Sequence, residues 1–268
     1  DIGRTSDSRL EAAEDTLFPL VDSITLSDIT VTYLDRGSGR EIVLRMESLE
    51  QRHGGAGQEP AQVSGTGSLN RQTFRIDAQV GSIEDAIAAL KPYPLDISLH
   101  STNFTLLAKG TVDDLPGGRG LDISLNFDSP SLSAILRMLQ IDAEGFGAAQ
   151  AALRLKGGFA APAAEEIAVS VTAPQGETFT AQGRIANLVR GDGVDLSFNG
   201  TLDPRPLALL TGASQSLQAI TSGLTNLDVS GRLTGSYARL SLEAVDLRAA
   251  HVAGAQAGLR GRAAAGFT

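Results

Sequence analysis

The residues Leu121-Asp122-Ile123-Ser124-Leu125-Asn126-Phe127 alternate strictly between apolar and polar side chains. Successive side chains of a β-strand point to opposite faces, so this run predicts a strand with one apolar and one solvated face. The same alternation recurs in residues 24–26, 29–33, 74–78, 95–99, 167–171, 194–198 and 240–244. Antiparallel sheets with one face on water show this pattern, so the sequence predicts a mainly β fold.

Three stretches interrupt the alternation with helical spacing: residues 82–90, 130–139 and 206–220. Ser82 is placed to cap the first of them, and the second carries apolar residues at helical intervals from Leu132 to Leu139. Turns rich in Gly, Asp and Asn separate the other runs. We therefore expect short strands joined by tight turns, with a few short helices between them.

A short motif with a central glycine recurs along the chain, where we expect one strand to end and the next to begin. Its central residues are Gly65, Gly110, Gly157, Gly183 and Gly231. Residues 108–127 and 181–200 also align without a gap at an offset of 73, with eight identities. Repeats of this size are typical of stacked supersecondary units. We expect one continuous, elongated antiparallel repeat sheet over residues 1–268, with approximate units 17–90, 91–143, 144–213 and 214–268.

Composition argues against several classes of function. The chain carries 22 basic and 31 acidic residues, a net charge of −9, and only 4% aromatic residues, which predicts no nucleic-acid partner. There is no cysteine, the three histidines are scattered, and no nucleophile, metal or phosphate-binding motif occurs. The adjacent carboxylates of Asp113-Asp114 and Glu165-Glu166 are interpreted as solvated turns. We expect no enzymatic activity, no metal and no cofactor.

Several stretches together resemble one bacterial protein family. They are Leu17-Phe18-Pro19-Leu20 with residues 24–35, Ser64-Gly65-Thr66-Gly67-Ser68-Leu69-Asn70, and the run from Gly81-Ser82-Ile83 through residues 91–96, 110–114 and 121–122 to Leu132, Leu136 and Leu139. These stretches resemble the AsmA family of Gram-negative bacteria, well over residues 17–142 and more loosely beyond.

The resemblance implies a periplasmic protein anchored in the inner membrane, with its sheet curled into a groove that carries phospholipid between the inner and outer membranes. The implied partners are phospholipid or another acyl-chain lipid, the inner membrane through an anchor missing from this sequence, and an outer-membrane or periplasmic protein. The chain begins at Asp1 without a leader-like segment, which leads us to expect a processed chain or a piece of a longer one.

Alternation and the resemblance together predict which side chains line such a groove. The expected lining is Ile24, Leu26, Ile29, Val31, Leu95, Ile97, Leu99, Ile123, Leu125, Phe127, Leu196 and Phe198. The intervening Thr25, Asp96, Ser98, Asp122, Ser124, Asp195 and Ser197 are expected to face water.

Other interpretations remain open at this point. The apolar parity could be an ordinary core, sealed under a second sheet. The protein could also be a non-enzymatic periplasmic scaffold that assists outer-membrane protein assembly. An extracellular β-solenoid is disfavoured, because the motif glycines lie 45, 47, 26 and 48 residues apart, whereas a solenoid repeats about every 20–25 residues.

Overall fold

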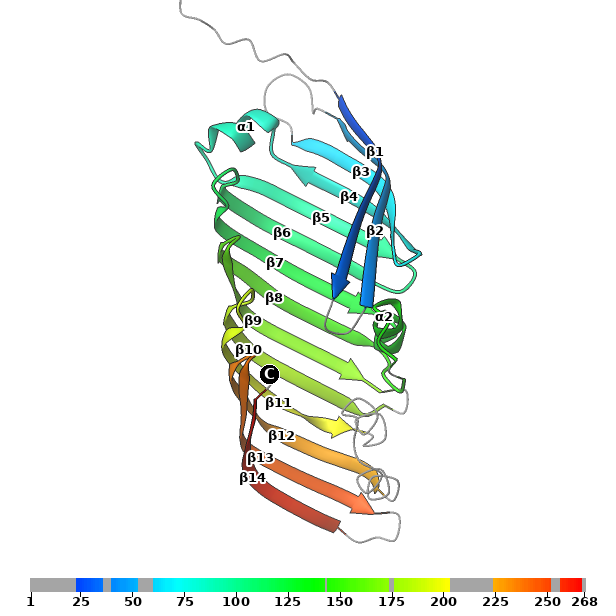
Figure 1. Cartoon of the computed structure of the whole chain (residues 1–268), viewed down its shortest axis with the longest axis vertical. Coiled ribbons are helices and arrows are strands. Elements are labelled where there is room, and N and C mark those ends of the chain that lie inside the picture. Colours follow the sequence, from blue (N-terminus) through cyan, green and yellow to red (C-terminus); the bar gives the residue numbers. More distant parts are fainter. Residues whose placement is uncertain are drawn as a thin grey trace, which may run out of the picture.

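The chain forms one long antiparallel sheet in which the strands follow one another in sequence order. The computed structural model describes residues 23–35, 40–52, 60–142, 144–173, 176–202, 224–251 and 256–266. Fourteen strands pair in the order β1 to β14, each antiparallel to the next (Figure 1). This confirms the mainly β, elongated antiparallel fold expected from the alternation. Thirteen strand spacings of about 4.8 Å give a sheet about 62 Å long.

The elements have these bounds: β1 (Ser23–Asp35), β2 (Arg40–Arg52), β3 (Ala61–Leu69), β4 (Gln72–Val80), α1 (Ile83–Ala88), β5 (Tyr93–Ser101), β6 (Thr105–Asp114), β7 (Arg119–Ser129), α2 (Leu132–Met138), β8 (Ala149–Gly158), β9 (Ala161–Thr172), β10 (Thr178–Asn187), β11 (Asp192–Leu202), β12 (Leu224–Ser236), β13 (Arg239–His251) and β14 (Gln256–Gly266).

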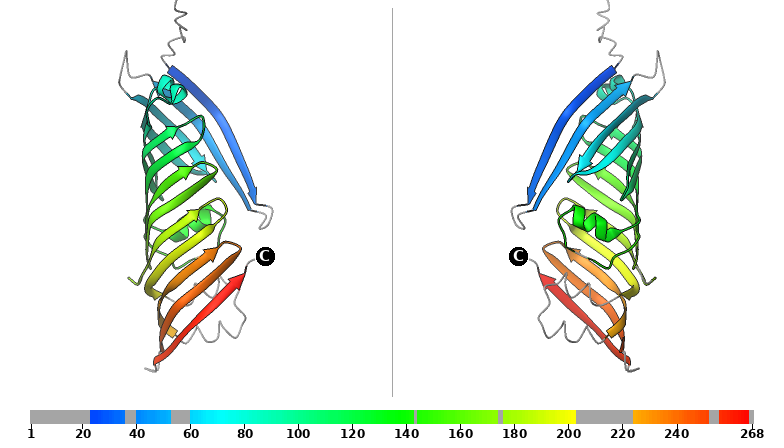
Figure 2. Two further views of the ribbon diagram at one scale, coloured as in Figure 1. Left: turned by 90° about the vertical axis from the view of Figure 1, so that its left-hand side faces the viewer. Right: turned by 90° about the vertical axis from the view of Figure 1, so that its right-hand side faces the viewer.

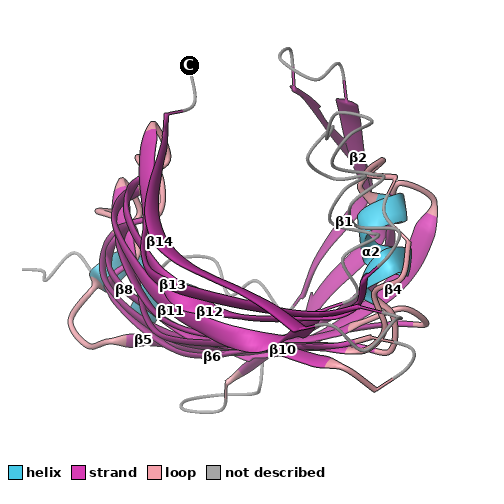
Figure 3. Cartoon of the chain, turned by 90° about the horizontal axis from the view of Figure 1, so that it is seen from below, coloured by secondary structure: helices cyan, strands magenta, loops and turns pink. Residues whose placement is uncertain are grey.

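The sheet is open and strongly curved. Strands β1 and β14 stand at its two ends, each paired with one neighbour. Viewed along its length, the sheet has a U-shaped cross-section (Figure 3). The β1–β2 hairpin diverges from the direction of the other strands and stands out from the sheet on its concave side (Figure 2). Asp28 in β1 has φ +56°, and β2 has a register shift against β3 between Met46 and Ser48. Irregularities of this kind bend a strand pair.

The two helices form where the sequence predicts them. Ser82 caps α1, its hydroxyl accepting from the Asp85 amide at 3.1 Å, and Ser131 caps α2 in the same way through the Ala134 amide at 3.2 Å. The expected helix at residues 206–220 lies outside the described residues. Within the described part of the chain, neither helix is long and apolar enough to cross a membrane.

Four of the five motif glycines lie inside strands, so the expectation that they mark strand ends is wrong for Gly65, Gly110, Gly183 and Gly231. Gly157 is the next-to-last residue of β8, where that expectation holds. Gly110 is in the middle of β6, and a Cβ there would collide with the carbonyl oxygen of Asp122 on β7. A Cβ on Gly183 in β10 would likewise collide with the carbonyl oxygen of Asp195 on β11. A glycine has no side chain, so it interrupts the apolar–polar alternation of a strand. In the sequence, a glycine at which two strands approach closely therefore resembles a turn glycine.

The repeat found in the sequence extends further in three dimensions. The aligned strands β6–β7 and β10–β11 are followed by β8 and β12, which also correspond. Phe159 after β8 donates its amide to the Gly118 carbonyl (2.9 Å), and Tyr237 after β12 does the same to Gly191 (3.0 Å). In both cases the aromatic ring lies over that glycine. The structural unit is therefore four strands long, β6–β9 and β10–β13.

Candidate functional site

The predicted lining residues lie on one face of the sheet. The register pairs Ile97 with Ala108 and Ala108 with Leu125, so these side chains share a face across β5, β6 and β7. The same face holds Leu196 and Phe198 on β11, opposite Gly183 and Ala181 of β10. At the other end, the register also puts the four predicted β1 positions on this face: Leu26 pairs with Leu49, Val31 with Leu44, Ile29 with Met46 and Ile24 with Gln51. The side chain of Ile24 is not among those described.

This apolar face is the concave one. The chain leaves β7 at Ser129, forms α2 on the apolar face and returns to β2, where the Gln140 side-chain amide donates to the Glu41 carbonyl (2.9 Å). Helix α2 packs on residues of this apolar face, and Figure 3 shows the helix at the inner side of one rim of the curved sheet. The apolar face is therefore the concave one.

Helix α2 covers part of this face. Its Ile135, which is 8% exposed, forms a buried cluster with Phe74 and Phe104. Around this α2 cluster pack Leu44, Met46, Leu69, Leu99, Leu106, Phe127, Leu132, Met138 and Leu139. Two predicted lining residues, Leu99 and Phe127, thus contact protein on this face.

Asn70 in the β3–β4 turn holds α2, β2 and the turn together. Its side-chain amide donates to the Met138 carbonyl (2.6 Å), and its side-chain oxygen accepts from the Val43 amide (2.8 Å). Its own amide donates to the Val43 carbonyl (2.8 Å). Asn70 has φ +47°, a left-handed conformation that asparagine tolerates better than most residues. The sequence motif contained Asn70 but gave no sign of these long-range partners.

The rest of the concave face carries apolar side chains without a covering layer in the described residues. In β1, Ile29 is 38% and Val31 53% exposed. Leu95, Ile97, Ile123, Leu125, Leu196 and Phe198 are half-buried. The register adds residues that the sequence-based set omitted, namely Leu153, Leu155, Val169, Leu233 and Leu242, all half-buried. The same period-two alternation could have identified two of these, Val169 in residues 167–171 and Leu242 in residues 240–244.

The opposite, convex face is polar and crossed by ion pairs. The predicted water-facing residues lie on it: Asp96 pairs with Lys109 (2.7 Å), Asp122 with Arg154 (2.5 Å) and Asp195 with Arg232 (2.7 Å). Hydrogen bonds from the two guanidinium groups lower the pKa of Asp122 and of Asp195 below the usual value for aspartate. This parity is the one expected from register, since a one-residue slip would turn these charges into the concave face.

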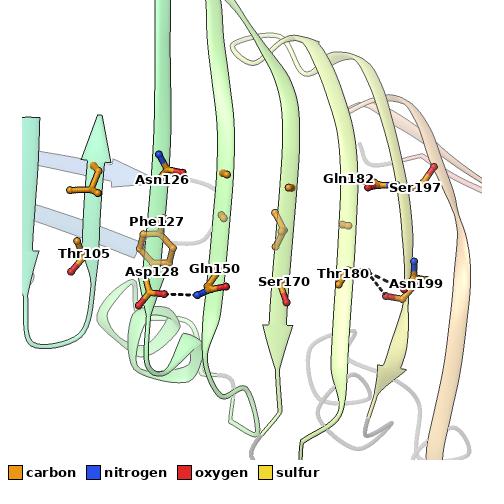
Figure 4. A pocket seen from close by; sticks show the side chains of 16 residues that line it. Thr105, Asn126, Phe127, Asp128, Gln150, Ser170, Thr180, Gln182, Ser197 and Asn199 are labelled. Carbon is orange, nitrogen blue, oxygen red and sulfur yellow. Dashed lines mark hydrogen bonds between the residues drawn. The ribbon is translucent and has the colours of Figure 1, made fainter. Parts of the chain in front are cut away.

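A shallow depression of about 620 Å³ lies over β6 to β11 and is lined mainly by polar-parity residues (Figure 4). The Gln150 amide donates to Asp128 (3.0 Å), and the Thr180 hydroxyl donates to the Asn199 side-chain oxygen (3.0 Å). Ser170, Gln182 and Ser197 add hydroxyl and amide groups, above a floor that includes Ala152 and Ala168. Asp128 is the one ionisable residue in this lining, so it contains no pair of groups for acid–base chemistry.

The adjacent carboxylates do not form such a pair either. Asp113 and Asp114 are the last two residues of β6, so the predicted turn begins directly after them, and Asp114 accepts from the Gly117 amide (2.8 Å) in that turn. Glu165 and Glu166 lie within β9, so their interpretation as a turn is wrong. Glu166 has φ +52° at a register shift between β8 and β9, and Glu165 pairs with Lys156 (3.0 Å). Across the described residues, no group of three His, Cys, Asp or Glu is arranged to hold a metal ion.

The concave apolar face is therefore the candidate site, and it offers apolar side chains without an ionisable group among the predicted lining residues. No protein-family model matches the chain, and neither a curated protein nor a solved structure matches it.

Proposed function

We propose that this chain is a lipid-binding segment that carries phospholipid acyl chains along the concave face of its sheet. The observation that supports the proposal is a continuous apolar face that stays half-exposed across the sheet, with α2 as its one helical cover among the described residues. Large exposed apolar surfaces on proteins mark binding sites for apolar partners.

The physical chemistry of the face suits acyl chains. Each CH₂ group removed from water contributes about 0.8 kcal/mol, so a long chain gains much affinity without any specific polar contact. Leu, Ile, Val and Ala dominate this face, and the described depressions are lined mainly by residues of the polar parity. A surface of this kind favours sliding contact along an acyl chain over recognition of one headgroup.

The elongated shape supports a transfer role over simple storage. Over the described side chains the face runs from β1 to β13, about 58 Å by strand spacing. Together with the resemblance to the AsmA family, this leads us to propose a periplasmic segment of a protein anchored in the inner membrane, which conducts phospholipid between the inner and outer membranes and contributes to outer-membrane biogenesis.

A binding experiment on matched variants tests the proposal. The purified chain is incubated with vesicles of phosphatidylethanolamine and phosphatidylglycerol, separated from them, and analysed by native mass spectrometry and lipid extraction. Leu196→Asp puts a charge on the concave face, and Ser197→Asp puts the same charge on the next residue, which faces outward. We expect bound phospholipid on the wild type and Ser197→Asp, and at least a several-fold loss on Leu196→Asp.

The contrary results are equally defined. A wild-type chain that carries no phospholipid would refute lipid binding and favour the scaffold that assists outer-membrane protein assembly. Equal lipid on the two aspartate variants would show that lipid binds elsewhere than on the concave face.

A further inference from the structure

The cross-strand rows of the concave face show where acyl chains can lie. One row runs from Phe127 on β7 through Ala151, Val169 and Ala181 to Phe198 on β11. Its two ends carry the same residue type in different surroundings. Phe127 stacks on Phe104 in the α2 cluster, with ring centroids 6.3 Å apart, whereas Phe198 stacks on Phe179 at 6.0 Å, outside that cluster.

Helix α2 covers the Phe127 end of this row. Leu132, Ile135, Met138 and Leu139 give an apolar strip that packs on the concave face from β2 to β7. The strip is held firmly, because the fully buried Ser129 donates to the Asn103 carbonyl (2.7 Å) before the helix and Asn70 binds the Met138 carbonyl after it. No corresponding cover is present over Phe198 in the described residues.

We infer that α2 is a built-in substitute for an acyl chain, which sets the boundary of the lipid-binding area. This inference rests on the proposed function. Along the α2 side of β4 to β7 the concave face is already filled by protein. Lipid is therefore confined there to the middle of the strands, at Ile97 and Leu125. Leu99 and Phe127, although of the lining parity, do not contact lipid.

Site-specific photocrosslinking tests this boundary on the full chain. A benzoyl-phenylalanine replaces Phe127 or Phe198 in separate proteins, and Leu125 in a third, so that the probes differ chiefly in their distance from α2. Each protein is loaded from vesicles of phosphatidylethanolamine and phosphatidylglycerol and irradiated, and lipid adducts are counted by mass spectrometry. We expect adducts at positions 198 and 125, and at least tenfold fewer at position 127.

Loosening α2 provides the second measurement. Ile135→Ala removes the helix's buried contact, while Leu136→Ala changes the neighbouring residue, which is outside the α2 cluster. We expect Ile135→Ala to raise adduct formation at position 127 several-fold without changing position 198, and Leu136→Ala to change neither.

Two results would overturn the inference in distinguishable ways. Equal adducts at positions 127 and 198 in the otherwise wild-type chain, or no rise at 127 in Ile135→Ala, would refute the boundary while leaving lipid binding intact. Absence of adducts at all three positions, together with absence of extractable lipid, would refute the proposed function itself.

Discussion

Arg154 on β8 donates two hydrogen bonds, of 2.5 and 2.7 Å, to the two carboxylate oxygens of Asp122 on β7. Arg232 on β12 holds Asp195 on β11 in the same bidentate way, at 2.7 and 2.8 Å. The two aspartates are 73 residues apart, and the two arginines 78. One cross-strand ion pair is thus repeated on the convex face, once in each four-strand unit.

These ion pairs predict how stability depends on pH. Because the pKa of Asp122 is lowered in the folded state, its contribution is present above the unfolded pKa of about 3.9 and is lost as pH falls through the folded value. Asp122→Asn should therefore lower the urea midpoint of unfolding at about pH 7, and the difference from wild type should be smaller at about pH 2. Asp142→Asn is the control, since Asp142 is exposed and has no ion pair among the described residues. An equal effect of Asp122→Asn at both pH values would contradict this.

The close approach of β6 to β7 predicts a cost for any side chain at Gly110. A Cβ there meets the Asp122 carbonyl and the Ile123 backbone, neither of which is the flexible end of a side chain. We expect Gly110→Val to destabilise the fold by about 1–3 kcal/mol. Ala108→Val, two residues away on the same face, should cost less, because Ala108 already has a Cβ. Chemical denaturation of both variants measures the difference, and equal midpoints would count against it.

Asn70 is predicted to hold the β1–β2 hairpin against α2. Asn70→Gly permits the same left-handed backbone but removes both side-chain hydrogen bonds. We expect a loss of about 1–3 kcal/mol and faster hydrogen exchange at the Val43 amide, which loses its acceptor. Gln140→Ala removes one exposed bond to Glu41 and should have a smaller effect. Unchanged exchange at Val43 in Asn70→Gly would show that the hairpin is held in another way.

The α2 cluster predicts a contrast between neighbouring residues. Ile135→Ala leaves a cavity among Phe74 and Phe104 and should cost about 2–4 kcal/mol. Leu136→Ala lies outside the cluster and should cost about 1 kcal/mol or less. Thermal or urea unfolding of the two variants decides, and comparable losses would mean that α2 is not anchored through Ile135.

Local pattern was sufficient to predict strands β1, β4, β5, β7, β9, β11 and β13 and the parity of their faces. Strands β3, β6, β10 and β12 were not recognised as continuous, because a motif glycine lies inside each of them. The period of two alone identified residues 121–127 and 194–198 as strands. The aspartates between their apolar residues showed which face of each strand is exposed to water. In the sequence, the four-strand repeat was detected only over residues 108–127 and 181–200, which align without a gap. Arg154 and Arg232 were missed because their offset differs from that of Asp122 and Asp195 by five residues.

What the sequence did not reveal is long-range contact. Phe104 lies outside the alternating runs and becomes part of a core because α2 covers it. The partners of Asn70 are 27 and 68 residues away, at Val43 and Met138, beyond the reach of any local pattern. The packing of Leu99 and Phe127 against the α2 cluster is likewise a long-range contact, which the parity of the strands alone does not reveal.

Every strand pairs only with the strands next to it in the sequence, and this arrangement makes molecular length easy to change. Inserting or deleting one four-strand unit would leave the hydrogen bonds inside every other unit as they are. Each such step would alter the reach of the protein by about 19 Å. Gene duplication could in this way adjust the span of the protein to the distance between two fixed boundaries, in whole units and without a new fold.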